Sequence, residues 1–372
     1  MPSCFIEISR DALRHNFCEI RKLVGATPII AVVKANAYGH GIVEASRVFA
    51  DEGAHMLAVT RLEEAVSLRD AEVQTPILLL TPPLPDEENE CVKLNLTCCV
   101  SCLEDAQRLS KAAVSQQKTV RVQLKINSGM SRLGVEPEEA ARVAAEIIAL
   151  PNIELEAAWT HFAFAAEADE SSTRTAFASF QSATKQIESA TGIGVFHCAN
   201  SAATLRFPAM KLGGVRPGTV LYGQFPSDEA RIAAQESGIV LRDGFRVCAR
   251  VLAVRDVKRG QSVGYGGEWR AAKNERIATI GIGWADGLTL SPDARTPDAK
   301  RTLQSAMKNI LRPPGRFVKY GEHCTPIIGR IAMQQTSILT THLPEIQVGD
   351  IVTVSMRRLA ANSLLPRVYM ND

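Results

Sequence analysis

The chain has 372 residues, which is enough for two domains that each bury a core of their own. Its apolar share of 46%, charged share of 22% and net charge of +2 argue against nucleic acid or an anionic membrane as the main partner. No run approaches the ~18 apolar residues of a membrane span, and the first residues lack the apolar stretch of a secretory signal. Nine cysteines without an export signal indicate reduced thiols, so we expect a cytoplasmic protein.

The first 220 residues alternate between predicted helices and short apolar strands. An amphipathic helix is predicted over residues 10–24, with Ser9 as its N-cap and Gly25 at its end. The predicted strands are residues 29–33, 56–59, 77–80, 97–100, 120–126, 155–159, 195–197 and 212–215, and amphipathic stretches between them include 61–70, 136–148 and 173–190. Apolar strands separated by helices indicate a parallel sheet, and eight such units indicate a closed (β/α)8 barrel of the TIM type. An open, doubly wound sheet is the alternative.

A mainly β region follows the barrel. After about residue 235, segments such as 244–267 and 275–287 read as strands joined by polar turns, without regularly spaced helices. Residues 290–314 are polar and contain prolines, which predicts a loop with a short helix. We therefore expect an α/β fold with a barrel domain over residues 1–234 and a mainly β domain over residues 235–372. The first few residues are an exception, because they could pair as a strand with the mainly β domain.

Charged and polar side chains follow the predicted barrel strands, and in such barrels the reactive residues lie at the carboxyl ends of the strands. Lys34 follows the first strand, where burial of an ammonium among apolar side chains is costly unless the amine reaches water or serves in chemistry. Later strands are followed by Lys125, Arg132, His161, Asn200, Ser201, Arg216 and Gly218. Taken singly, His161 could be a structural histidine, Asn200 a helix N-cap and Arg216 part of a surface ion pair. Their convergence on one rim favours a functional site.

The two last barrel strands add a clue to the cofactor. The loops after strands seven and eight commonly form a phosphate pocket, with a serine hydroxyl and glycine N–H groups as donors. A lysine that faces a phosphate pocket across a barrel mouth indicates pyridoxal 5'-phosphate (PLP). The amine forms a Schiff base with the PLP aldehyde, and the pyridine ring then withdraws electrons from the neighbouring carbon.

Six motifs resemble those of the bacterial alanine racemases, which are PLP-dependent isomerases with a barrel and a β domain. The motifs are AVVKANAYGHG (31–41), HCANSAATLRFP (197–208), VRPGTVLYG (215–223), SVGYGG (262–267), GIGWADG (281–287) and IIGRIAM (327–333). They occur in the family's order, and the match runs from about residue 5 to residue 355. The resemblance implies that the chain interconverts L- and D-alanine in the cytoplasm, in the biosynthesis of D-alanine as a peptidoglycan precursor. It also implies a homodimer in which the partner chain completes each active site.

The resemblance also implies a role for each matching residue. Lys34 carries PLP and is one of two acid–base groups, and Tyr265 from the partner subunit is the other. PLP is further bound by Tyr38, Ser201, Gly218 and Thr219 at its phosphate, by Asn200 at its phenolic oxygen, and by Arg216 at its pyridine nitrogen with His161 behind it. The substrate carboxylate is bound by Arg132 and by the backbone at Met333 of the partner subunit. Lys125 is the position that is often carbamylated, and its carbamate would orient Arg132.

This residue set suits racemisation, because a proton must leave one face of the α-carbon and another must arrive at the opposite face. A lysine and a tyrosine on the two faces do this without turning the substrate. Arg216 stays protonated, so it keeps the pyridine nitrogen unprotonated, which limits side reactions. PLP-dependent barrel decarboxylases have a carboxylate there instead.

Several positions depart from the family pattern. Gln334 replaces an aspartate, Trp284 replaces a tyrosine, and residues 290–314 are longer than the corresponding connection. The C-terminal end lacks a helical segment with a further tyrosine, for which Tyr369 is no obvious substitute. These differences leave open a racemase of broader or different specificity, for example for serine, or a PLP-binding protein without turnover.

The sequence contains one cysteine cluster, which could in principle bind a metal ion. Cys98, Cys99 and Cys102 lie close together, but neither a fourth ligand nor a second clustered pair is evident. We therefore expect small buried side chains and no metal.

Overall fold

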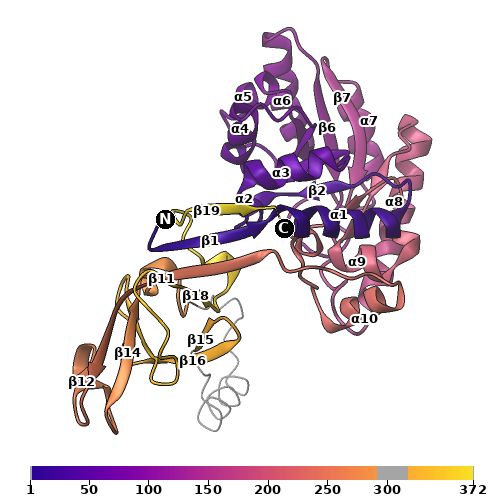
Figure 1. The fold of residues 1–372 in the computed structure, drawn as a ribbon. Coiled ribbons are helices and arrows are strands. Elements are labelled where there is room, and N and C mark those ends of the chain that lie inside the picture. Colours follow the sequence, from indigo (N-terminus) through magenta and orange to yellow (C-terminus); the bar gives the residue numbers. More distant parts are fainter. Residues whose placement is uncertain (1, 291–316, 372) are drawn as a thin grey trace. The chain divides into compact units, whose positions relative to one another are not determined.

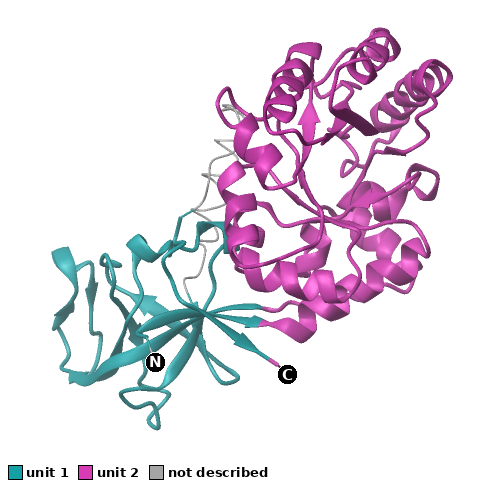
Figure 2. Cartoon of the chain, turned by 90° about the horizontal axis from the view of Figure 1, so that it is seen from above, with its two compact units in different colours: residues 1–8, 245–370 teal, residues 9–244, 371–372 magenta. Residues whose placement is uncertain are grey.

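The computed structural model describes residues 2–290 and 317–371, which form two compact units (Figures 1 and 2). One unit spans residues 9–244, and the other combines the N-terminal residues up to Ile8 with Phe245–Met370. The loop predicted over residues 290–314 lies, apart from Leu290, outside the described residues. In the described part of the chain, no helix has the length and apolar character needed to span a membrane.

The larger unit contains a parallel barrel surrounded by helices, as Figure 2 shows in magenta. Its strands are β2 (Ile30–Val32), β3 (Met56–Val59), β4 (Ile77–Leu79), β5 (Thr97–Val100), β6 (Val120–Lys125), β7 (Ile153–Trp159), β8 (Phe196–His197), β9 (Ala199–Asn200) and β10 (Val215–Arg216). Strands β2 to β8 pair in chain order, and all of these pairs are parallel. Most of their side chains are apolar on both faces, because helices cover one face and the barrel interior the other.

The last two strands close the barrel. The seventh strand is interrupted at Cys198 and so appears as β8 and β9, and β9 pairs in parallel with β10. A parallel bridge between Ile29 and Val215 then joins the last strand to the first. The predicted closed barrel is therefore confirmed, and the open sheet is wrong. The predicted eighth strand at residues 212–215 was misplaced, because Leu212 and Gly213 form a turn and pairing begins only at Val215.

Ten α-helices and two 3₁₀ turns are described in this unit. They are α1 (Arg10–Val24), α2 (Lys34–Tyr38), α3 (Ile42–Asp51), α4 (Leu62–Asp70), α5 (Glu88–Lys93), α6 (Leu103–Ser115), α7 (Ala140–Ile148), α8 (Ser171–Thr191), α9 (Ser201–Arg206), α10 (Asp228–Glu236), η1 (Pro208–Met210) and η2 (Thr219–Tyr222). Helix α1 has the predicted bounds, because the Ser9 side chain accepts a hydrogen bond from Ala12 N and Gly25 ends the helix at a φ of 61°. Its apolar stripe, which includes Leu13 and Phe17, is buried.

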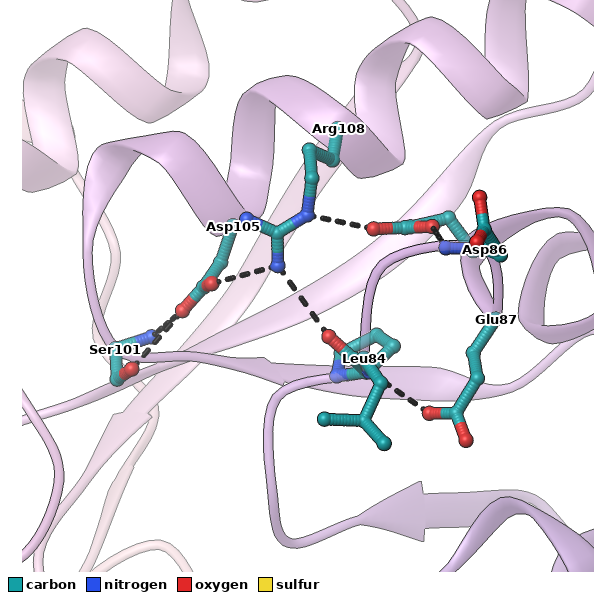
Figure 3. A network of polar contacts seen from close by, with 8 residues as sticks. Leu84, Asp86, Glu87, Ser101, Asp105 and Arg108 are labelled. Carbon is teal, nitrogen blue, oxygen red and sulfur yellow. Dashed lines mark hydrogen bonds and ion pairs between the residues drawn. The ribbon is translucent and has the colours of Figure 1, made fainter.

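A polar network fixes two loops at the carboxyl end of the barrel (Figure 3). Arg108 of α6 donates hydrogen bonds to Glu88 at 2.6 Å, to Asp105 at 2.9 Å and to the Pro83 carbonyl at 3.3 Å. Asp105 in turn accepts hydrogen bonds from the backbone N–H and the hydroxyl of Ser101. Both carboxylates are buried, so the guanidinium balances charges that would otherwise be costly. The network ties the loop after β4 to the loop after β5.

The smaller unit is mainly β. Its elements are β1 (Cys4–Ser9), β11 (Phe245–Val257), β12 (Ser262–Val263), η3 (Tyr265–Gly267), β13 (Trp269–Arg270), β14 (Glu275–Ile280), η4 (Trp284–Asp286), β15 (Phe317–Tyr320), β16 (His323–Ile328), β17 (Thr336–Leu339), β18 (Ile351–Val354), η5 (Arg358–Ala360) and β19 (Arg367–Met370). The strand order is β14-β17-β16-β15-β18-β11-β1-β19, and a further pairing of β14 with β11 closes the sheet. The long β11 makes this possible, because its first half pairs with β18 and β1 and its second half with β14.

Two of the three clustered cysteines are part of the barrel wall, whereas Cys102, which was expected to be buried, lies half-buried at the start of α6. Cys98 and Cys99 are buried in β5, and burial raises the pKa of the Cys99 thiol to about 12, so it stays protonated. Within the described residues, no group of three or more His, Cys, Asp or Glu side chains is arranged to hold a metal ion.

Candidate active site

A cavity of about 380 Å³ opens where the barrel strands end. Its lining residues are Val32, Lys34, Tyr38, Thr60, Leu80, Thr81, Lys125, Arg132, Leu133, Trp159, His161, Ser201, Arg216, Gly218 and Thr219. Nine of the residues singled out in the sequence are among them, although they come from the ends of five different strands and the loops that follow them. The exception within the barrel is Asn200, which is the N-cap of α9 and accepts a hydrogen bond from Ala203 N at 3.0 Å.

Lys34 begins a turn of unusual handedness. The next three residues, Ala35 to Ala37, have φ of 53–54° and ψ of 47–51°, and Tyr38 also has a φ of 53°. L-residues in this left-handed region cost roughly 1–2 kcal/mol each, so such a run persists only where the surroundings impose it. The turn matters for the site because Lys34 and Tyr38, at its two ends, both line the cavity.

The Tyr38 ring is held by a neighbouring aromatic ring. It packs against the ring of Tyr222 at 4.9 Å, and the Tyr222 hydroxyl donates to the Val32 carbonyl at 3.0 Å. Burial raises the pKa of Tyr38 to about 12, so its hydroxyl is a hydrogen-bond donor at any physiological pH.

Ser201, Gly218 and Thr219 line the same cavity as Tyr38. The Gly218 N–H donates to Ser201 Oγ at 2.8 Å, and a Cβ on Gly218 would come within 2.5 Å of the Tyr38 hydroxyl, so only glycine fits there. The Thr219 hydroxyl is buried and has no hydrogen-bond partner in the described structure. Hydroxyl donors around a glycine are suited to an anion such as a phosphate group.

The amine of Lys34 is electrostatically prepared for nucleophilic chemistry. Burial lowers its pKa, and the Arg132 guanidinium lowers it further, while Glu64 acts in the opposite direction. A lysine with a lowered pKa spends more time as the neutral amine, which is the form that attacks a carbonyl carbon.

Arg216 is anchored by a relay of side chains that crosses the barrel. Its guanidinium donates to Nδ1 of His197 and also to the carbonyl of Thr160. His197 Nε2 lies 2.9 Å from Gln123 Oε1, and the Gln123 amide donates to Glu156 Oε1 at 2.7 Å. Because Nδ1 accepts a hydrogen bond, the proton of the neutral imidazole must reside on Nε2. Burial, followed by Arg216, holds the pKa of His197 well below its usual range, in agreement with a neutral ring.

His197 and Gln123 are residues that the sequence did not single out. The sequence places His161 behind Arg216, and burial and the Arg216 charge do hold the pKa of His161 well below its usual range. The histidine that is hydrogen bonded to Arg216 is nevertheless His197. The signal was present in the motif HCANSAA, which begins with this histidine, but histidine identity alone does not reveal a partner across the barrel.

Lys125 and Arg216 share one aromatic ring. The Lys125 ammonium lies 3.9 Å and the Arg216 guanidinium carbon 4.6 Å from the centre of the Trp159 ring. Burial lowers the pKa of Lys125 to about 7, with Arg216 and Arg132 acting in the same direction and Cys99 opposing them. Near neutral pH a large fraction of this amine is therefore uncharged.

The remaining predicted residues, Tyr265 and Met333, lie in the smaller unit. Their side chains are 69% and 59% exposed, and Trp284 nearby in the same unit is 47% exposed. Met333 lies beside η4, because Ala285 N donates to its carbonyl at 2.9 Å. Gly283 permits this approach, since a Cβ there would lie 2.2 Å from the Ala332 carbonyl oxygen. Large exposed apolar side chains such as these are typical of an interaction surface.

These observations define a class of protein: a barrel enzyme with a reactive lysine and an anion cradle in one cavity, joined to a closed β unit. Comparison with known proteins agrees. The sequence model of the alanine racemase N-terminal domain matches residues 8–226, and that of the C-terminal domain matches residues 245–364. The chain belongs to the alanine racemase family.

Similar proteins cover almost the whole chain. An alanine racemase of Desulforamulus reducens is 35% identical over 353 residues, which is 94% of this chain and 88% of that protein. One of Methanococcus maripaludis is 36% identical over 94% of this chain and 87% of its own length. Among solved structures, an alanine racemase of Clostridium difficile has a TM-score of 0.88 at 29% identity, covering 100% of this chain and 97% of that one. An alanine racemase of Bacillus anthracis with bound L-Ala-P has a TM-score of 0.83 at 28% identity, covering 100% of this chain and 96% of that one.

Proposed function

We propose that this chain is a PLP-dependent racemase that interconverts L- and D-alanine by a two-base mechanism. The observation that carries the proposal is the single cavity in which Lys34, of lowered pKa, shares the lining with Gly218 and with the hydroxyl groups of Ser201 and Thr219. Membership of the alanine racemase family supports alanine as the substrate.

The residues of the cavity fit PLP. The buried Thr219 hydroxyl without a partner, the Tyr38 hydroxyl and Gly218, where a Cβ would meet Tyr38, are suited to the phosphate group. Arg216 would donate to the pyridine nitrogen, and His161 and Asn200 complete the proposed cofactor-binding set. When bound through Lys34, the cofactor supplies an electron-withdrawing group that acidifies the α-hydrogen of the amino acid.

The two bases are Lys34 and Tyr265 of the partner subunit. The lowered pKa of Lys34 leaves its Nζ atom able to accept a proton from one face of the α-carbon. Tyr265 has an exposed side chain in the single chain, as expected for a residue that completes the site of a second copy. Racemisation then needs one group to take the proton while the other delivers one.

Arg132 and the backbone of Met333 from the partner subunit would bind the substrate carboxylate. Lys125 lies close enough to Arg132 and Arg216 for both cations to lower its pKa. A neutral Lys125 amine can add to CO₂ with loss of one proton. The resulting carbamate is an anion, so it would attract the Arg132 guanidinium, which the Lys125 ammonium repels. We propose that this anion orients Arg132.

The proposal extends to the whole molecule. We propose a cytoplasmic homodimer that provides D-alanine as a peptidoglycan precursor, with residues 1–234 binding PLP and residues 235–372 supplying the partner's contribution. The exposed Tyr265, Trp284 and Met333 side chains support a contact between copies on this surface.

Lysine mapping tests the cofactor assignment, because two amines of lowered pKa line the cavity. We expect the protein to capture PLP on Lys34, as shown by borohydride reduction and peptide mass spectrometry. Lys34→Ala should abolish both the Schiff-base absorbance and racemisation, whereas Lys125→Ala should keep the absorbance. Labelling of Lys125, or protein that takes up no PLP, would contradict the assignment.

A racemase of different or broader specificity is the second candidate. Trp284 N donates to the Ala332 carbonyl at 3.0 Å, so the backbone of this residue lies beside the segment that contains Met333, and both Trp284 and Gln334 are exposed. A chiral assay over all common amino acids separates the two candidates. Alanine should be the fastest substrate, and faster turnover of serine or a longer amino acid would favour the second candidate.

A further inference from the structure

The left-handed turn between Lys34 and Tyr38 needs an external constraint. Its residues are Ala35, Asn36 and Ala37, and of these only asparagine adopts left-handed backbone angles at low cost. The Asn36 side chain accepts a hydrogen bond from Ile42 N at 2.8 Å, which fixes the end of the turn near α3. The beginning of the turn, next to Lys34, is held from another element.

Glu64 of α4 provides that contact. Its Oε1 atom accepts hydrogen bonds from Ala35 N at 2.5 Å and from Asn36 N at 3.4 Å. Its Oε2 atom accepts from Thr60 N at 3.1 Å and from Arg61 N at 3.2 Å, at the start of its own helix. One carboxylate therefore joins the loop after β2 to the loop after β3.

Both loops contribute to the cavity. Lys34 lines it from the first loop and Thr60 from the second, and the Thr60 carbonyl accepts a hydrogen bond from Thr81, a third lining residue. A displacement of Glu64 would therefore move the backbone from which the Lys34 side chain extends, and so move its amine relative to the other residues that line the cavity.

We propose that Glu64 is a positioning residue that fixes the left-handed turn and thereby aims the Lys34 amine in the cavity. This inference rests on the proposed function for the role of Lys34, although the contacts of Glu64 stand independently of it. A carboxylate suits the task because it has two acceptor oxygens, one for each loop. Glutamine keeps the shape but has only one acceptor oxygen, so it can satisfy one loop and leaves N–H groups of the other unpaired.

The charge of Glu64 gives a second, separable effect. Lys34 is influenced by Glu64 from α4, by Arg132 from the loop after β6 and by His161 after β7. Glu64 is the negative member of this set, so its neutralisation favours the uncharged amine. The pH at which Lys34 becomes reactive should shift to lower values in Glu64→Gln.

The experiment compares Glu64→Gln and Glu64→Ala with Glu63→Gln, which neutralises the adjacent, exposed carboxylate on the same helical turn. Hydrogen exchange of the peptide spanning residues 33–39 should become roughly tenfold faster in both Glu64 variants, as expected for loss of a hydrogen bond to a charged group. The rate at which added PLP is captured on Lys34 should show a pH midpoint shifted to lower pH. For alanine we expect kcat to fall about 10- to 100-fold with KM changed less, because a misplaced catalytic group costs rate more than binding.

The outcomes separate the two proposals. Unchanged exchange and an unchanged pH midpoint in Glu64→Gln would overturn the positioning role, even if its thermal stability fell. Equal effects in Glu63→Gln would overturn it as well. If wild-type protein captured no PLP on Lys34, the proposed function would fail, while the exchange data would still decide whether Glu64 holds the turn.

Discussion

At the scale of single residues, burial determines which groups of the cavity carry charge. It lowers the pKa of Lys34 and brings that of Lys125 to about 7, whereas the pKa of Arg216 falls only to about 10. Near neutral pH the guanidinium remains a cation, while a large fraction of the Lys125 amine is neutral, and the lowered pKa of Lys34 raises the neutral fraction of its amine at any given pH. The same desolvation therefore leaves a permanent charge at one position and reactive amines at two others.

The Lys125 amine predicts a pH dependence of stability. Its pKa is lowered from 10.5 to about 7 in the folded state, so between these values the unfolded chain binds a proton that the folded chain does not. The free energy of unfolding should then rise with pH through this window, by at most about 1.4 kcal/mol per pH unit from this group, and level off below it. Urea unfolding of PLP-free protein in CO₂-free buffer should show that Lys125→Met raises the free energy of unfolding of the protein more at pH 7 than at pH 10. An equal effect at both pH values would contradict a lowered pKa.

Gly218 is predicted to be irreplaceable at the anion cradle. In Gly218→Ala the new Cβ would meet the Tyr38 hydroxyl, whose ring cannot easily yield because it packs on Tyr222. We expect PLP affinity, measured by equilibrium dialysis, to fall at least tenfold, and stability to fall by about 1–3 kcal/mol. Gly214→Ala is the matched control, because its nearest neighbour would be the Pro28 carbonyl oxygen at 3.5 Å. Unchanged PLP binding in Gly218→Ala would count against the cradle.

At the scale of elements, four barrel strands, β6, β7, β8 and β10, each contribute one residue to the hydrogen-bonded relay that ends at Arg216. Gln123 lies on β6, Glu156 on β7, His197 on β8 and Arg216 on β10. Because successive barrel strands present side chains to the same interior, four residues far apart in the chain form one hydrogen-bonded line. The line fixes the His197 tautomer, and that tautomer fixes Arg216.

Gln123→Glu should break the relay by changing the charge on His197. A carboxylate at this position favours the imidazolium, whose Nδ1 atom then donates and can no longer accept from Arg216. We expect ¹⁵N NMR of labelled histidine to show a neutral ring with its proton on Nε2 in wild type and a doubly protonated ring in the variant at pH 6. Racemisation should fall at least tenfold. A neutral ring in both proteins would refute the proposed coupling.

At the scale of the whole molecule, the predicted catalytic groups are divided between the two units. Lys34 belongs to the barrel unit, whereas Tyr265 and Met333 belong to the mainly β unit, where their side chains are exposed. An exposed phenol has no role in acid–base chemistry unless something encloses it. A second copy of the chain that brings Tyr265 to the cavity would account for both observations.

Mixing of variants tests the shared site. Lys34→Ala and Tyr265→Ala homodimers should both be inactive, whereas each heterodimer contains one site with both defects and one intact site. Unfolding and refolding an equimolar mixture should therefore restore roughly a quarter of wild-type racemisation. Absence of any recovery, with dimers present by light scattering, would contradict a site completed by the partner.

The sequence by itself determined the elements whose signals are local. The helix at residues 10–24 and the strands at residues 56–59 and 97–100 have their predicted bounds, because caps and uninterrupted apolar runs specify them. The rim positions of Lys34, Arg132 and Arg216 were also accessible, since strand ends in a parallel barrel meet at one face.

Only the tertiary structure decided how these residues are held. The turn after Lys34 is left-handed although its sequence does not favour that conformation, because Glu64, from helix α4, supplies the acceptor. His197 rather than His161 is hydrogen bonded to Arg216, and the last barrel strand begins at Val215, where pairing with both neighbours becomes possible. In each case the deciding hydrogen bond joins residues far apart in the chain, and local propensity carries no information about such a partner.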